Sequence, residues 1–156
     1  MAGTAKKFNL KAGIYASLIG GLVMSIMLGM MGSFPGIASM VGSDSAIVGF
    51  IVHLVISAIF GIGFAYFIGF IKQPIVAGVI FGVIIWVIGP LVIMPMLMGG
   101  DVAVCGSICG SACGAASDPC GNACGGGSSS GMWLSLVSHG IYGLVTGLVF
   151  KLIPIK

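Results

Sequence analysis

The sequence has very few charged residues. Only 6% of its 156 residues are charged, and they comprise six lysines and three aspartates, with no arginine and no glutamate. Soluble domains contain about a quarter charged residues. With 58% apolar residues and a mean hydropathy of +1.25, the chain is therefore excluded from the class of water-soluble folds. About four membrane crossings at roughly 20 residues each would use almost all of it, which leaves no room for a separate soluble catalytic domain.

Signatures of nucleic-acid binding and of catalysis are also missing. The lysines are divided between the two termini and one short loop, so they form no basic stripe. No carboxylate lies inside an apolar run, and the chain has no Gly-x-Ser-x-Gly elbow, no phosphate-binding glycine loop with a lysine and no His-Glu-x-x-His pair. We therefore expect neither an enzyme nor a nucleic-acid partner.

Long apolar runs dominate the sequence instead. They cover about residues 12–32, 46–71, 75–98 and 132–152, each long enough as a helix to cross a hydrocarbon core of about 30 Å. The runs are apolar on every face, unlike the alternating strands of a membrane barrel. The sequence predicts an all-α, polytopic membrane protein, with residues 1–156 as one membrane domain of four transmembrane helices in a lipid bilayer.

The charges predict one orientation for these four crossings. All six lysines fall on one side of a four-pass chain, and all three acids fall on the other, at Asp44, Asp101 and Asp118. The positive-inside rule makes the lysine side cytoplasmic. We expect both termini in the cytoplasm and a multipass protein of a prokaryotic cytoplasmic membrane. A cleaved signal peptide is the alternative for the first run, because Lys6 and Lys7 precede it and small residues follow it.

The chain also contains a weak internal repeat. Gly13 matches Gly78, while His53 and Gly61 match His139 and Gly147 at one constant offset. Such matches predict a duplicated helical hairpin, with parallel copies related by an approximate two-fold axis along the membrane normal. The repeat favours retention of the first helix.

Each run carries small residues at every fourth position. In lipid such small-residue ridges allow close helix contact, so we expect them to face inward. The alternative is that glycine is simply frequent in membrane helices. The ridge residues expected to pack are Gly13, Ser17, Gly21, Ser25, Gly29, Ser57, Gly61, Gly78, Gly82, Gly143 and Gly147.

Two histidines are the only ionisable residues well inside the runs. His53 and His139 each lie about seven residues from the outer end of a predicted helix. An intramembrane ionisable residue is by default a functional candidate. The pair could hydrogen-bond neighbouring helices, bind a metal or haem, or form part of a path for protons or small solutes. Met94 and Met98 share a helical face at the outer side, and thioether with imidazole suits copper, although methionine is also an ordinary apolar filler.

The segment 99–131 is a glycine- and serine-rich loop with five cysteines. Their spacing is C-x3-C-x3-C-x6-C-x3-C, which matches neither a zinc knuckle nor a ferredoxin. The predicted topology places the loop outside the cytoplasm, where disulfides form. Two disulfides with one odd thiol, or metal ligation, are the alternatives. The cysteines are Cys105, Cys109, Cys113, Cys120 and Cys124.

Two stretches resemble a known family. They are Trp86-Val87-Ile88-Gly89-Pro90-Leu91-Val92-Ile93-Met94-Pro95 and His139-Gly140-Ile141-Tyr142-Gly143-Leu144-Val145-Thr146-Gly147. They resemble small prokaryotic four-helix membrane proteins of unknown function, which implies the four-pass fold and no particular activity. We expect an accessory subunit or small binding module, working with other membrane subunits or as a homo-oligomer. Copper or haem binding and oligomeric transport are the alternatives.

Overall fold

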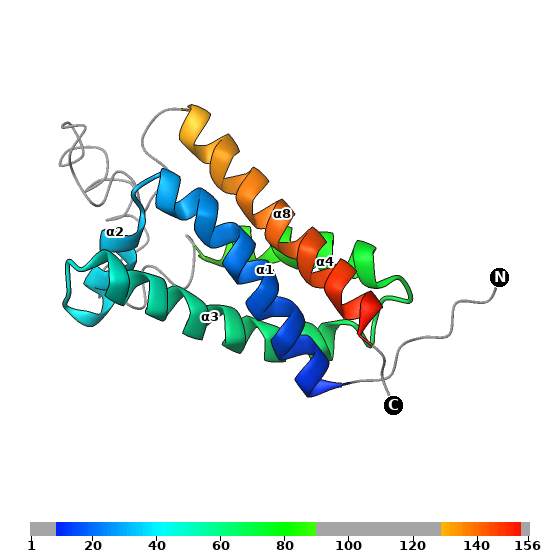
Figure 1. The fold of residues 1–156 in the computed structure, drawn as a ribbon. Helices are drawn as coiled ribbons and strands as arrows, with labels where there is room; N and C mark the ends of the chain where they lie inside the picture. Colours follow the sequence, from blue (N-terminus) through cyan, green and yellow to red (C-terminus); the bar gives the residue numbers. More distant parts are fainter. Residues whose placement is uncertain (1–8, 90–128, 154–156) are drawn as a thin grey trace.

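The computed structural model describes residues 9–89 and 129–153, and this part of the chain forms helices and turns without a strand. The predicted all-α class is therefore confirmed there. In chain order, the elements of Figure 1 are α1 (Leu10–Met30), α2 (Phe34–Ala38), the 3-10 helix η1 (Ser39–Val41), α3 (Ala46–Phe67), α4 (Pro74–Ile88) and α8 (Ser129–Leu152).

Local chemistry explains several helix limits. The Asn9 side chain accepts a hydrogen bond from the Ala12 amide at 3.0 Å, which caps the start of α1. Pro74 begins α4, where its missing amide proton costs nothing. Gly32 and Gly42 follow α1 and η1 with φ of 66° and 73°, a conformation that side chains disfavour.

The helix limits differ from the predicted ones in several places. α3 ends at Phe67, before the predicted residue 71, and the chain turns before Pro74. The predicted loop after the first helix contains α2 and η1, because Pro35 suits a helix start that the apolar runs did not reveal. α4 ends at Ile88 with Gly89 as its C-cap, and residues 90–98 of the predicted third helix lie outside the described residues.

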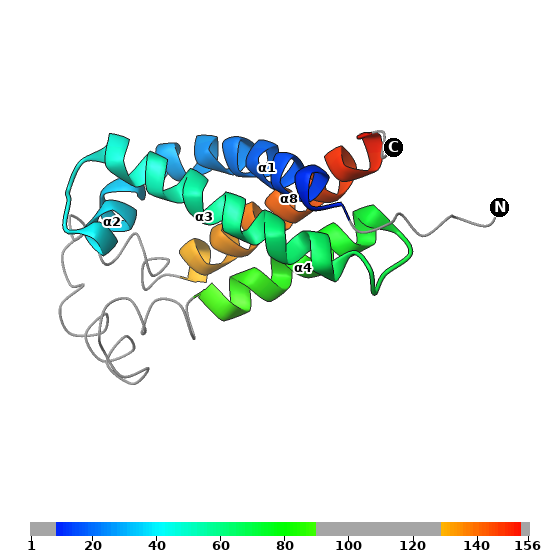
Figure 2. The same cartoon turned by 90° about the horizontal axis from the view of Figure 1, so that it is seen from below.

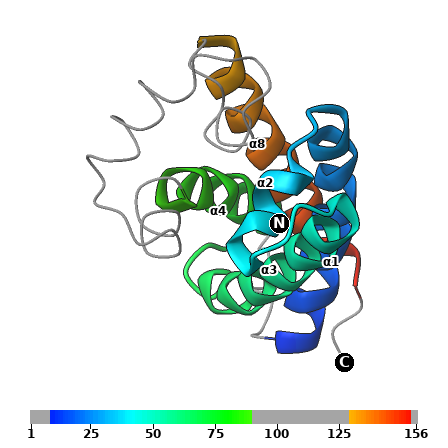
Figure 3. The same cartoon turned by 90° about the vertical axis from the view of Figure 1, so that its left-hand side faces the viewer.

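The long helices form two close pairs. α1 packs on α3 and α4 packs on α8, while α1 and α8 also pack on each other and join the pairs. α3 and α4 meet far less extensively. Figures 2 and 3 show this arrangement from below and from one end.

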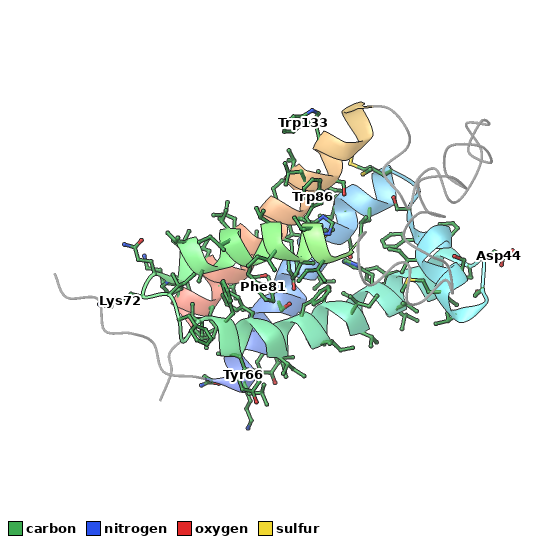
Figure 4. All side chains as sticks on the ribbon, turned by 180° about the vertical axis from the view of Figure 1, so that it is seen from behind. Asp44, Tyr66, Lys72, Phe81, Trp86 and Trp133 are labelled. Carbon is green, nitrogen blue, oxygen red and sulfur yellow. The ribbon has the colours of Figure 1, made fainter. Side chains whose placement is uncertain are left out.

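One end of the bundle carries the described lysines. The start of α1, the α3–α4 turn and the end of α8 lie together at that end (Figure 1). Lys11, Lys72 and Lys151 belong to these segments. Figure 4 shows Asp44 at the opposite end from Lys72. We call these the lysine end and the Asp44 end.

Side chains are distributed as in a membrane protein. Large apolar residues such as Ile26, Ile47 and Leu152 are exposed, whereas the buried set is rich in alanine, serine and glycine. Three helices, α1, α3 and residues 133–152 of α8, are long and apolar enough to cross a membrane, and α4 is a shorter apolar helix over its described length. A surface of large apolar side chains around buried hydroxyls suits lipid and not water. The helices thus indicate a lipid bilayer as the surroundings.

Glycines bring the paired helices into backbone contact. A methyl group added at Gly13 of α1 would lie 2.6 Å from the Gly61 carbonyl oxygen of α3. One added at Gly78 of α4 would overlap the Gly143 carbonyl oxygen of α8 and lie 2.8 Å from the Gly147 Cα. Distances under 3.0 Å are essentially never found for real Cβ atoms, so only glycine permits these approaches.

Candidate functional site: a polar core between α1, α3 and α8

A cluster of hydroxyl groups joins three helices at the centre of the bundle. The Ser17 hydroxyl of α1 donates to the Ser57 carbonyl oxygen of α3 at 2.6 Å, and it also hydrogen-bonds the Tyr142 hydroxyl of α8. Ser17 is fully buried and Tyr142 nearly so. We define the hydroxyl cluster as the side-chain oxygens of Ser17, Tyr142 and Thr146. The bonds of Ser17 and Tyr142 satisfy polar groups that lipid could not.

Thr146 is the incompletely satisfied member of the hydroxyl cluster. It lies one turn beyond Tyr142 on α8 and beside that hydroxyl, yet within the described residues its buried Oγ1 makes no hydrogen bond of acceptable geometry. The absent side chain of Gly20 leaves space in front of it, because an added methyl group there would overlap Thr146 Oγ1. An unpaired buried hydroxyl costs about 1–3 kcal/mol.

His53 lies nearer the Asp44 end, and α1 fixes the orientation of its ring. Its Nε2 is 3.2 Å from the Gly21 carbonyl oxygen, and only 8% of the residue is exposed. A carbonyl oxygen only accepts hydrogen bonds, so Nε2 carries the proton and, in the neutral ring, Nδ1 has a lone pair. The same Gly21 oxygen accepts from the Ser25 hydroxyl at 2.8 Å.

His139 repeats this arrangement on α8. Its Nδ1 is 2.8 Å from the Ser135 carbonyl oxygen, so Nδ1 is the donor and Nε2 has the lone pair. The Ser138 hydroxyl donates to the same oxygen at 2.8 Å. His139 is half-buried. Within the described residues, neither lone-pair nitrogen has a hydrogen-bond partner.

Phenylalanines fill the bundle toward the lysine end. The Phe64 ring centroid lies 5.4 Å from that of Phe81 and 5.5 Å from that of Phe150, and Phe67 lies 5.5 Å from Phe81. Figure 4 shows Phe81 between α4 and α3. We call these four residues the aromatic cluster. It bridges α3 and α4, whose backbones make few contacts with each other. The aromatic cluster fills that half of the core with apolar side chains.

The sequence-predicted ridge residues do not all lie in equivalent surroundings. Most lie between paired helices, as Gly61, Gly82 and Gly147 do. Gly29 is instead exposed near the end of α1, with only the Phe34 ring in contact distance. Ser25 is buried but bonds within its own helix. The remaining ridge residues contact a partner helix or are buried in the core.

Several candidate ligands lie outside the described residues. These are Met94, Met98, Cys105, Cys109, Cys113, Cys120 and Cys124. In the described segments, no three histidine, cysteine, aspartate or glutamate side chains come together as a metal-binding group. Of the predicted metal ligands, only the two histidines therefore lie within the described residues.

Thr146 and Gly20 are the core residues that the sequence analysis missed. Thr146 stands four residues after Tyr142 and seven after His139, so helical spacing from the histidine would have placed it on the same face of α8. Gly20 is adjacent to the ridge residue Gly21 and falls outside the four-residue step. Its contact with α8 depends on how α8 packs against α1, which the small-residue ridge of α1 alone cannot predict.

Comparison with known proteins identified no relative of this chain. No protein-family model, no curated protein and no solved structure matches this chain. The resemblance drawn from residues 86–95 and 139–147 therefore remains a prediction, and function has to be argued from the polar core itself.

Proposed function

We propose that this chain is a non-enzymatic, four-pass membrane protein that works as a small binding module within a membrane assembly, with its binding site in the polar core. The observation that supports this proposal most is the position of the two histidines. Both rings are oriented by a backbone carbonyl, and each keeps one nitrogen available. Ionisable groups in membrane interiors are costly and usually serve a function.

The proposed topology adds a fourth crossing to the three apolar helices. α4 begins beside the lysine end, and the sequence stays apolar after Ile88 to about residue 98. With Lys11, Lys72 and Lys151 at one end and Asp44 at the other, the positive-inside rule favours a cytoplasmic lysine end. The cysteine-containing segment 99–131 would then be extracytoplasmic.

Equivalent contacts support the proposed duplication. Gly13 meets Gly61 in the first pair of helices, and the matching residues Gly78 and Gly147 meet in the second. His53 and His139 likewise occupy matching positions and each donates to a backbone carbonyl that a serine hydroxyl shares. The acceptors differ, because Gly21 is on another helix and Ser135 is one turn away on the same helix.

Binding is a better proposal than transport for a single chain. The aromatic cluster occupies the core toward the lysine end, so the polar core has no continuous row of hydrophilic side chains to that side among the described residues. A path through the bilayer requires polar groups or water over its full length. A site that is polar in one half and apolar in the other is suited to holding a ligand.

Native mass spectrometry of the full chain in mild detergent tests this proposal. We expect a bound species, seen as added mass that collisional activation removes, in the wild type and in Phe67→Leu. A His53→Ala, His139→Ala double variant should lose it. Phe67→Leu is the matched control because Phe67 belongs to the aromatic cluster and is only partly buried.

Two results would contradict the proposal. One is a wild-type chain with no added mass when isolated from its native membrane. The other is added mass that the double variant retains. Circular dichroism of each variant establishes that its helices are intact, so a lost ligand is not mistaken for a lost fold.

A further inference from the structure

We infer that the outer side of the α4–α8 crossing binds an anionic phospholipid, with the lipid phosphate held by Lys72 and Lys151 and an acyl chain lying along the crossing. We call this side the α4–α8 seam and define it by four exposed apolar residues, Val79, Val83, Leu144 and Leu148. The inference goes beyond the proposed function and does not depend on it, because it involves neither histidine and no member of the hydroxyl cluster.

A backbone contact brings the two lysines to the same crossing. A methyl group added at Gly147 of α8 would overlap the Pro74 carbonyl oxygen and lie 3.0 Å from the Ile75 Cα, so the last turns of α8 lie against the start of α4. Lys151 follows Gly147 by one helical turn, and Lys72 precedes Pro74 by two residues. Both lysines are exposed, and Figure 4 shows Lys72 at this end of the bundle. Two ammonium groups therefore lie at the lysine end of the α4–α8 seam.

The charge at this end is of one sign in the described segments. Asp44 is the one acid there, and it lies at the opposite end of the bundle from Lys72. Lys11, on the first turn of α1, adds a further positive charge at the lysine end. Charge complementarity thus favours an anionic partner. Basic sites between membrane helices are known to bind the headgroups of anionic lipids.

The seam itself is apolar and faces the surroundings of the bundle. In α4 and α8, the residue after each contact glycine is exposed, and these residues are the four that define the seam. The residue before each contact glycine is buried, and these residues are Ala77, Phe81, Tyr142 and Thr146. α4 begins and α8 ends at the lysine end, so the two helices are antiparallel, and the residues that follow their contact positions lie on one side of the crossing.

A phospholipid matches both the lysines and the seam. Leu144 lies two turns before Lys151 on the same face of α8, about 10 Å deeper along the helix. A lipid whose phosphate contacts the two lysines would therefore have its acyl chain beside Leu144 and Leu148. A soluble anion would use only the lysines, and an acidic protein segment would have no reason to follow an apolar seam into the bilayer.

Native mass spectrometry with two lipids tests the inference. The full chain in mild detergent is titrated with phosphatidylglycerol and, separately, with phosphatidylcholine. Each lysine near a membrane surface contributes about fivefold to the binding of anionic lipid. We expect Lys72→Gln and Lys151→Gln each to weaken phosphatidylglycerol binding by about fivefold and to leave phosphatidylcholine binding unchanged. Lys11→Gln is the matched control, because Lys11 is exposed at the same end but belongs to the α1–α3 pair, and it should have little effect.

Three results would overturn the inference. One is equal binding of the two lipids by the wild type. Another is a Lys11→Gln variant that loses as much phosphatidylglycerol binding as Lys72→Gln, which would indicate a diffuse effect of charge. The third is release of the lipid by an equal concentration of inorganic phosphate, which would assign the lysines to a soluble anion.

Fluorescence quenching by brominated lipids tests the position of the acyl chain. Leu148→Trp is made in a chain whose Trp86 and Trp133 are changed to phenylalanine, and the protein is placed in phosphatidylcholine vesicles. At equal mole fraction, brominated phosphatidylglycerol should quench more strongly than brominated phosphatidylcholine, and Lys72→Gln should remove the difference. Ile62→Trp is the control, because Ile62 is similarly exposed on α3, and both lipids should quench it equally. Equal quenching of the Leu148→Trp chain by both lipids would contradict a lipid in the seam.

Discussion

At the scale of single residues, polar groups in this protein are satisfied mainly through backbone carbonyls. Ser17, His53 and Ser138 all donate to a main-chain oxygen. This pattern follows from the solvent, because lipid offers no hydrogen-bond partner and helix carbonyls have a second lone pair to share. The bond between the Ser17 and Tyr142 hydroxyls joins two side chains instead, and it ties α1 to α8.

Removal of the Tyr142 hydroxyl should weaken the bundle modestly. Tyr142→Phe loses the bond to Ser17, while Ser17 keeps the Ser57 carbonyl as an acceptor. We expect a loss of about 0.5–1.5 kcal/mol in the free energy of unfolding, as for typical buried hydrogen bonds in membrane proteins. Titration with a denaturing detergent in mixed micelles, followed by circular dichroism, measures it. Tyr15→Phe is the control, because Tyr15 is 61% exposed on α1, the helix that carries Ser17, and should change nothing. Equal losses in both variants would disprove the role of this bond.

At the scale of helices, glycine position decides the packing of each pair. All four long helices carry small residues four positions apart. Only some of the glycines among them contact the backbone of a partner helix. Gly143 faces Gly78 and Gly82 across the α4–α8 contact, whereas Gly140 on the same helix has nothing within 4 Å of an added methyl group. The two positions differ by less than one turn.

Alanine at Gly143 should separate α4 from α8. Its Cβ would overlap the Gly78 carbonyl and lie 3.0 Å from the Gly82 Cα, and backbone atoms cannot move aside as a side chain can. We expect a loss of about 1–3 kcal/mol in the free energy of unfolding. Gly140→Ala should cause no loss, since alanine favours the helix by up to about 1 kcal/mol. The detergent titration compares them, and a Gly143 variant as stable as the Gly140 variant would contradict this contact.

The α1–α3 contact should respond in the same manner. A methyl group at Gly61 would lie 2.7 Å from the Ile14 Cα and 2.8 Å from the Gly13 carbonyl oxygen, whereas one at Gly63 would make an ordinary 3.5 Å contact with Phe81. Gly61→Ala should therefore cost about 1–3 kcal/mol, and Gly63→Ala little. If the two hairpins are copies, Gly147→Ala should cost about as much as Gly61→Ala in the same unfolding assay. A neutral Gly61→Ala would refute the close approach of α1 and α3.

At the scale of the whole molecule, charge placement predicts how the bundle lies in the membrane. The described lysines lie at one end and Asp44 at the other, although each charge is far from the rest in sequence. Positive residues near crossing ends are retained in the cytoplasm. The sequence predicts the same orientation if the chain crosses the membrane four times. One experiment therefore tests the orientation and the number of crossings together.

Labelling with a membrane-impermeant maleimide checks this orientation. In intact cells, after mild reduction, we expect label on the five cysteines of segment 99–131 and none on a cysteine-free variant. Lys72→Cys in the cysteine-free chain should react only after the membrane is opened, because the α3–α4 turn lies at the lysine end. Immediate labelling of that cysteine in intact cells would reverse the orientation or the number of crossings.

The sequence by itself determined the helical class, the membrane surroundings and the faces of close packing. Apolar runs free of charge can satisfy their backbone only as helices in lipid, and small residues four apart must share a face. It also singled out His53 and His139, because an imidazole is conspicuous in an apolar run.

Tertiary structure decided which helices meet and which nitrogens remain available. Sequence spacing could not show that α1 contacts both α3 and α8, that Gly20 leaves space for Thr146, or that His53 bonds another helix while His139 bonds its own. Each of these depends on the rotation and separation of neighbouring helices. In lipid no hydrophobic force sets those quantities, so they follow from the contacts of all the helices together.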